Sequence, residues 1–229
     1  MNQSLAIILI AAGNSSRLGH PKQLINFAGK TLLERSCQLA LSCSARVFVI
    51  LGYEANKMQP LISQENIMPV FNTHWQQGMG TSIACGIEQV VALTQLAQSS
   101  QKSLLKEQQT VNTGSIKGAM ILLCDQWRLT QSDLQHLITT WQNNPHKIIA
   151  SEYYEHKSSE LIQGAPVIFP VQYFSQLAAL TQTGARFLLK KNPQDVIAVP
   201  IENAAFDIDL AEDFKQLKIY EQQHYPAIT

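Results

Sequence analysis

Short runs of apolar residues alternate with longer stretches whose apolar residues recur at helical spacing. Several of the short runs are almost entirely Val, Ile and Leu, which is typical of strands that helices cover on both faces. The alternation predicts βαβ units and a mainly parallel sheet, and therefore an α/β protein. The expected strands are residues 5–11, 46–51, 68–72, 119–124, 147–150, 166–169 and 195–199.

Start signals mark several of the expected helices. Two helices begin with capping-box patterns, Thr31 with Glu34 and Thr130 with Asp133, in which each side chain bonds a free backbone N–H of the first turn. A third helix is expected to begin at residues 81–82, where a hydroxyl can cap it and an apolar face follows. These signals place helices after the expected strands, as βαβ units require.

A chain of 229 residues suits one domain, and no linker or internal repeat divides it, so we expect a single domain over residues 1–229. Residues 98–117 are rich in Ser, Gln, Lys and Thr and lack periodicity. This segment is expected to be a surface insertion or mobile loop between a helix and the fourth strand.

Composition excludes several classes of partner. The 17 basic and 17 acidic residues cancel, which leaves no electrostatic footprint for a nucleic-acid backbone and no basic surface for anionic membranes. The first apolar run is too short to span a bilayer and has no basic residue before it, so we expect a cytoplasmic protein. The four cysteines lack metal-site spacing and are expected to be reduced thiols in the core.

The loop after the first expected strand, residues 11–22, reads Ala-Ala-Gly-Asn-Ser-Ser-Arg-Leu-Gly-His-Pro-Lys. Small residues let backbone N–H groups approach phosphate oxygens, and ligands of α/β sheets bind at this end of the strands. Arg17 can contact a phosphate with two donors, and Lys22 can act as a compact cation. The loop matches neither a dinucleotide fingerprint nor a Walker A motif, and an ordinary strand-to-helix turn is the alternative.

Two further segments carry acidic residues that could bind a metal ion. Asp125 ends an apolar strand, and Asp207 and Asp209 alternate with apolar neighbours, so both point to one side of an extended segment. Mg²⁺ prefers one or two carboxylates together with substrate phosphates. For Asp125, the alternative is a helix-capping role. Glu212 and Asp213 are expected at the start of a last helix over residues 211–223.

The loop over residues 11–22 resembles the signature of the sugar-nucleotide and molybdenum-cofactor nucleotidyltransferases, with Arg17, Gly19 and Lys22 on the family's Arg, Gly and Lys. The resemblance to this MobA-like NTP transferase family covers most of the chain outside residues 98–117. It implies a Rossmann-like, three-layer domain of the nucleotide-diphospho-sugar transferase type.

The resemblance also assigns roles to residues. Arg17, Lys22 and Asp125 would be catalytic, Mg²⁺ would lie between Asp125 and Asp209, and Asp207 is a further candidate. The residues that would bind the nucleotide are Ala11, Ala12, Gly13, Ser15, Arg17, Lys22, Gly78 and Ser82. The residues that would bind the acceptor are Gly164, Pro166 and Arg186. A plain helix cap remains open for Ser82, and a structural anchor for Arg186.

Several positions depart from the family pattern. Trp127, followed by Arg128, replaces a proline that often comes two residues after the first Asp. Leu210-Ala211 replaces Thr-Pro, Ala165 replaces a polar residue, and Thr181-Gln182 replaces Gly-Asp. These departures leave open a non-catalytic protein that binds a nucleotide or cofactor.

The implied reaction moves a nucleoside monophosphate from an NTP to a phosphorylated acceptor and releases pyrophosphate. Family members with Ala-Ala-Gly in the first loop tend to use CTP, so residues 11–13 favour CTP over GTP. The implied acceptor is molybdopterin, and a sugar or alditol phosphate is the alternative. A molybdoenzyme or its chaperone would be the macromolecular partner.

Overall fold

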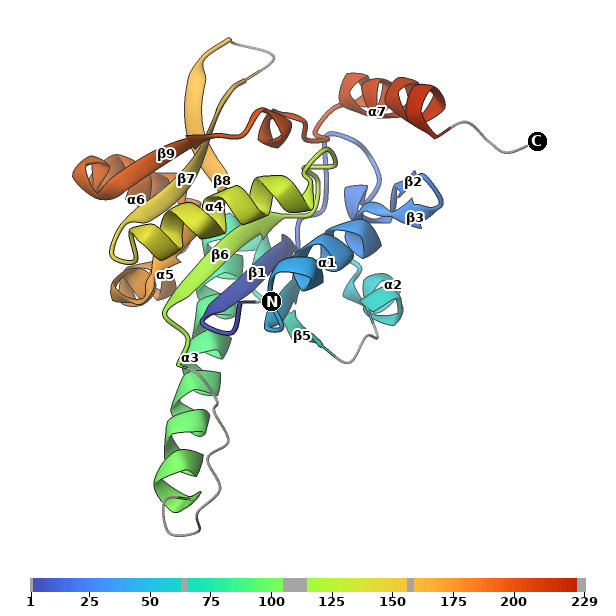
Figure 1. The fold of residues 1–229 in the computed structure, drawn as a ribbon. Coiled ribbons are helices and arrows are strands. Elements are labelled where there is room, and N and C mark those ends of the chain that lie inside the picture. Colours follow the sequence, from blue (N-terminus) through green and yellow to red (C-terminus); the bar gives the residue numbers. More distant parts are fainter. Residues whose placement is uncertain (1, 63–65, 105–114, 156–158, 226–229) are drawn as a thin grey trace.

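Seven strands form one sheet in the order β5-β4-β1-β6-β8-β7-β9 (Figure 1). The computed structural model describes residues 2–62, 66–104, 115–155 and 159–225. The strands are β1 (Leu5–Ala11), β4 (Val47–Leu51), β5 (Ile67–Phe71), β6 (Gly118–Leu123), β7 (Ile148–Tyr154), β8 (Leu161–Pro170) and β9 (Val196–Pro200). A separate two-stranded sheet consists of β2 (Asn26–Phe27) and β3 (Lys30–Thr31).

The sheet is mainly parallel, as expected, and β8 is the exception. β1 pairs in parallel with β4 and β6, whereas β8 runs antiparallel to both β6 and β7. All seven expected strands are present, but β8 begins at Leu161 and β7 continues to Tyr154. These extra residues pair with each other in a hairpin and include polar side chains such as Glu152 and Gln163, so an apolar run could not mark them.

Helices cover both faces of the sheet. They are α1 (Leu32–Cys43), α2 (Ala55–Met58), α3 (Met79–Leu104), α4 (Gln131–Asn143), α5 (Phe174–Ala178), α6 (Arg186–Lys191) and α7 (Ala211–His224). The short 3-10 helices are η1 (Lys22–Leu24), η2 (Gln59–Ile62), η3 (Trp75–Gln77), η4 (Val171–Tyr173), η5 (Pro193–Asp195) and η6 (Glu202–Ala205).

The two faces of β1 show how the core is divided. Ile7 and Leu9 belong to a buried cluster with residues of α1 and α4, whereas Ile8 and Ile10 belong to another cluster with residues of α3, α5 and α6. Alternate residues of a strand point to opposite faces, so a strand between two helical layers must be apolar throughout. The expectation of a three-layer α/β domain is confirmed.

The capping signals predicted two helix starts and missed a third. Thr31 with Glu34 and Thr130 with Asp133 both form complete capping boxes, at α1 and α4. The third helix, α3, begins at Met79 rather than at residues 81–82. The hydroxyls there are used differently, because the side-chain amide of Asn72 donates to both of them.

Part of the expected insertion is helical. α3 continues to Leu104 and extends well beyond the sheet (Figure 1), so residues 98–104 are helix and not loop. Gln, Lys and Leu have good intrinsic helix propensity, which an argument from apolar periodicity alone overlooks. Residues 105–114 lie outside the described residues, and the wider insertion stays a prediction. No helix in the described part of the chain is long and apolar enough to cross a membrane.

Candidate active site

The loop after β1 has a defined structure that a buried side chain maintains. Gln23 is 1% exposed, and its side-chain amide donates to the carbonyls of Ala11 at 2.9 Å and Gly13 at 2.8 Å. Ser15 has a left-handed backbone (φ 51°), and its hydroxyl accepts from the backbone N–H of Lys22 at 3.1 Å. This role of Gln23 was not predicted, because in the sequence Gln23 is an ordinary polar residue beside Lys22.

Three carboxylates meet at one edge of the sheet. Asp125 follows β6, and Asp207 and Asp209 lie in the segment between η6 and α7. The three residues can offer carboxylate oxygens that all lie within 4.8 Å of one another. The expectation that these segments converge is therefore correct, although Asp125 and Asp209 are far apart in the sequence.

Lys22 and Arg17 bring positive charge to the carboxylates. The Lys22 ammonium forms ion pairs with Asp125 and, at 2.9 Å, with Asp209. Arg17 lies 3.6 Å from Asp209 and is largely exposed. Burial alone would lower the pKa of Lys22, but the charges of Asp125 and Asp209 more than compensate and raise it above its ordinary value. Lys22 is therefore a cation held at the carboxylate cluster.

Burial and nearby negative charges change the acidity of Asp207. Its pKa is raised to about 6, first by the desolvation of its carboxylate and then by the charges of Asp125 and Asp209. A cation at this cluster would oppose both causes and favour the ionised form of Asp207.

The carboxylates fit a divalent cation. Hard oxygen ligands are those that Mg²⁺ and similar ions prefer. The Oδ1 atom of Asp125 is buried, and no described residue forms a hydrogen bond with it. A buried acceptor without a partner is costly, and a metal ion or a substrate-bound water would satisfy it. Asp213 is not part of this set, because its carboxylate accepts from the backbone N–H groups of Asp209 and Leu210.

A cavity of about 640 Å³ opens beside the cluster. Its lining comes from the loop after β1, the start of α3 and the end of β6. The lining residues include Ala12, Gly13, Arg17, Lys22, Gly78, Ser82 and Asp125, all of which the sequence indicated. Ala11 and Ser15 are not among them: Ala11 is the buried last residue of β1, and Ser15 supports the loop. The structure thus brings six of the eight predicted nucleotide residues to one cavity.

The glycines at the start of α3 let another part of the backbone approach closely. A Cβ atom on Gly78 would lie 2.5 Å from the carbonyl oxygen of Gln182, and one on Gly80 would lie 2.5 Å from the carbonyls of Thr181 and Thr183. Gly78 also has a φ of 126°, which side chains disfavour. The absence of side chains at Gly78 and Gly80 is therefore required by the 181–183 backbone, and Gly78 also lines the cavity.

The predicted acceptor residues come from two other elements, Gly164 and Pro166 from β8 and Arg186 from the start of α6. The Arg186 guanidinium donates to the Tyr153 hydroxyl at 3.3 Å, and a Cβ atom on Gly164 would lie 3.1 Å from Arg186 Nε. Pro166 lies two residues further along β8 and is buried. None of the three predicted residues lines the 640 Å³ cavity or a second cavity of about 460 Å³ beside Asp207 and Asp209.

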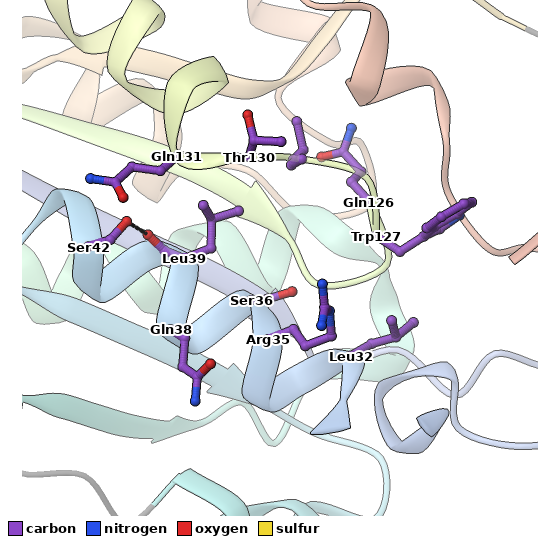
Figure 2. Close-up of a pocket in the computed structure, with 11 residues that line it drawn as sticks. Leu32, Arg35, Ser36, Gln38, Leu39, Ser42, Gln126, Trp127, Thr130 and Gln131 are labelled. Carbon is purple, nitrogen blue, oxygen red and sulfur yellow. Dashed lines mark hydrogen bonds between the residues drawn. The ribbon is translucent and has the colours of Figure 1, made fainter. Parts of the chain in front are cut away.

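A further cavity of about 320 Å³ lies behind the loop that carries Asp125, between α1 and the start of α4 (Figure 2). In Figure 2, Arg35 and Ser36 of α1 lie below the loop that bears Gln126 and Trp127. Ser36 donates to the carbonyl of Cys124, and the Gln126 side chain donates to the carbonyls of Ala165 and Ala204. The wall of this cavity therefore supports the backbone on both sides of Asp125.

Comparison with known proteins identifies the family. The MobA-like NTP transferase domain matches residues 6–196. The chain is 32% identical over 84 residues to the molybdenum cofactor cytidylyltransferase of Escherichia coli, a match that covers 36% of this chain and 44% of that enzyme. It is 24% identical over 217 residues to a probable molybdenum cofactor guanylyltransferase of Rhodopirellula baltica, which covers 90% of each chain.

Solved structures share the fold. A homologue of Mycobacterium tuberculosis Rv0371c from Mycobacterium sp. strain JC1 has a TM-score of 0.70 and 21% identity over 97% of this chain and 99% of that one. Rv0371c in complex with manganese has a TM-score of 0.62 and 18% identity over 93% and 97%. The fold is that of the nucleotide-diphospho-sugar transferases. The chain belongs to the MobA-like NTP transferase family and is a nucleotidyltransferase.

Proposed function

We propose that the protein transfers CMP from CTP to the terminal phosphate of molybdopterin and releases pyrophosphate. The observation that carries the proposal is the convergence of Lys22, Arg17 and three carboxylates at the mouth of the 640 Å³ cavity. Cations and metal-binding acids at one point suit the transfer of a phosphate-bearing group, in which negative charge must be neutralised. The family and the cytidylyltransferase name of the Escherichia coli relative support the finer assignment.

The cavity would hold the nucleotide, and the loop after β1 would hold its phosphates. Backbone N–H groups of this loop and the Arg17 guanidinium would contact the β- and γ-phosphates. Lys22 would move from the carboxylates to the α-phosphate, where it would stabilise the charge that develops. Gln23 would act indirectly, because its two hydrogen bonds fix the carbonyls of Ala11 and Gly13.

The reaction needs little acid–base chemistry. An oxygen of the acceptor phosphate attacks the α-phosphorus, a new P–O bond forms, and the bond from the α-phosphorus to the bridging oxygen breaks as pyrophosphate leaves. A phosphate monoester is largely ionised near neutral pH, so no strong base has to remove a proton. Positioning and neutralisation of charge would supply the catalysis.

Asp125 and Asp209, with Asp207 beside them, would hold Mg²⁺. The ion would supply further neutralisation of phosphate charge. The orphaned Oδ1 atom of Asp125 supports this assignment, as does the manganese in the Rv0371c structure. On the acceptor side, we propose that Arg186, at the start of α6 and beside Gly164 of β8, contacts the acceptor, with Pro166 as a further contact.

The test is pyrophosphate release with each of the four common NTPs, combined with molybdopterin, a hexose 1-phosphate or an alditol phosphate. Release should require molybdopterin and be fastest with CTP. Pyrophosphate release with a sugar or alditol phosphate would show that this compound, and not molybdopterin, is the acceptor. The protein would still be a nucleotidyltransferase. No release with any pair would favour a binding protein that has lost catalysis.

Ala12 should contribute to the choice of base. It is 2% exposed, and it lines the cavity at the point where β1 becomes the loop. Ala12→Gly would widen the cavity and loosen the backbone, so we expect the preference for CTP over GTP to fall about fivefold. Competition between the two nucleotides at equal concentration measures this preference.

The matched control for that experiment is Ala6→Gly. Ala6 lies on the same strand and is fully buried, but it is not among the residues that line the cavity. It should share the cost of glycine in a strand and leave the CTP preference unchanged. A wild-type enzyme that prefers GTP would exclude the cytidylyl assignment without affecting the family.

A further inference from the structure

Trp127, which stands where the family often has a proline, and Arg128 after it connect two parts of the site. Trp127 follows Asp125 by two residues, and its backbone N–H donates to the carbonyl of Phe206 at 3.2 Å. The two rings also meet edge to face, with centroids 6.0 Å apart. Phe206 directly precedes Asp207, so this contact links the loop that bears one carboxylate to the segment that bears the other two.

Arg128 makes a second contact with Phe206. Its guanidinium carbon lies 3.9 Å from the centroid of the Phe206 ring and 5.0 Å from that of Tyr220 on α7. In the described part of the chain, no carboxylate forms an ion pair with Arg128. Its contacts are therefore with aromatic faces, where a planar guanidinium can stack and the cation is attracted to the ring.

The segment that Arg128 contacts carries two of the three acids. Ile208 is fully buried, so its neighbours Asp207 and Asp209 turn the other way, toward the carboxylate cluster. Trp127 itself extends away from α1 toward the C-terminal part of the chain (Figure 2), where it contacts Tyr220 with centroids 5.1 Å apart. Loss of the Arg128 contact would remove one of the contacts that hold Phe206, alongside those with Trp127, and would let the segment that bears both acids shift.

We propose that Arg128 is a positioning residue that sets the distance between Asp125 and the Asp207–Asp209 pair, and so the affinity of the cluster for a divalent cation. The inference rests on the proposed metal site and goes beyond it. It gives a role to a pair of residues that would otherwise be only a departure from the family pattern. Arg128 contacts neither the metal nor the nucleotide in this account, and it acts through Phe206.

The chain offers a matched control. The rings of Phe27, Trp127, Phe206, Tyr220 and Tyr225 form an aromatic cluster. Arg35 on α1 contacts this aromatic cluster too, 4.4 Å from the centroid of Phe27 and 6.0 Å from that of Tyr225. Arg35 lies over Phe27 and Tyr225, whereas Arg128 lies over Phe206, next to the acids. Substitution of either arginine by Met removes a cation from an aromatic face and keeps the length of the side chain.

The experiment measures Mn²⁺ binding to the full chain by electron paramagnetic resonance, without nucleotide or acceptor. Arg128→Met should raise the Mn²⁺ Kd about fivefold to tenfold, Arg128→Lys should restore part of the loss, and Arg35→Met should stay within about twofold of wild type. Melting temperatures of the two Met variants should be similar, so a difference in metal affinity would not reflect stability alone.

Two results would overturn the inference and are distinct from failure of the metal site. Wild-type affinity in Arg128→Met would show that Phe206 keeps its place without the guanidinium. An equal loss of Mn²⁺ affinity in Arg35→Met would show that the aromatic cluster affects the metal site only through general stability. If the wild-type chain binds no Mn²⁺, the proposed metal site itself is wrong, and the inference falls with it.

Discussion

Asp125→Asn should reduce turnover by about 10³-fold, while the protein remains folded. The substitution keeps the shape of the side chain and removes the negative charge from the most buried member of the carboxylate cluster. It takes away both the proposed metal ligand and one of the two partners of Lys22. Steady-state pyrophosphate release gives the loss of activity, and circular dichroism with thermal melting checks the fold.

The same substitution at Asp209 and at Asp207, in the other segment, compares how much each acid contributes to turnover. Asp209→Asn should also cause a large loss, because Asp209 contacts both Lys22 and Arg17. Asp207→Asn should cause a smaller one. The reverse order would show that Asp207 is the metal ligand. Asp195→Asn is the control for the loss of one charge, since Asp195 pairs with Lys147 away from the cluster and should leave turnover unchanged.

The strands could be predicted because each carries its own signal. A strand buried on both faces must be apolar throughout, and β1 matched its expected bounds at both ends. The direction of β8 could not be predicted in the same way, because an apolar run does not show which way a strand crosses the sheet. The C-terminal half of α3 was missed because its sequence lacks an apolar face.

The site was predictable where a residue type and its place in the fold agree. Asp125, at the end of a strand, and Lys22, in the loop after another, are of this kind. Gln23 was not, because its role depends on two backbone carbonyls that the sequence does not bring together. The packing of Gly78 could not be predicted either, since only the folded chain shows that residues 181–183 approach it.

The aromatic contacts of Trp127 and Arg128 could not be predicted from sequence motifs. Set against the family pattern, these residues indicate only that a proline is absent. Their partners, Phe206 and Tyr220, lie some eighty or more residues further along the chain. A departure from a motif can thus be compensated by a contact that no local pattern contains.

Lys22→Met should separate catalysis from metal binding. Turnover should fall about 10³-fold, because the α-phosphate would lose the cation that stabilises developing charge. Mn²⁺ should bind several-fold more tightly, because the ammonium that pairs with Asp125 and Asp209 would no longer compete with the metal for the same oxygens. Pyrophosphate release measures the first effect, and electron paramagnetic resonance of Mn²⁺ measures the second.

Lys57→Met is the control for this pair of measurements. Lys57 pairs with Glu54 at 2.7 Å on the surface, so its loss removes an ion pair and a charge but leaves the cluster intact. Neither turnover nor Mn²⁺ affinity should change. Weaker Mn²⁺ binding in Lys22→Met would contradict the account, because it would mean that Lys22 holds the carboxylates in place for the metal. Opposite changes in turnover and affinity require that Lys22 neutralises the acids only until a metal ion takes its place.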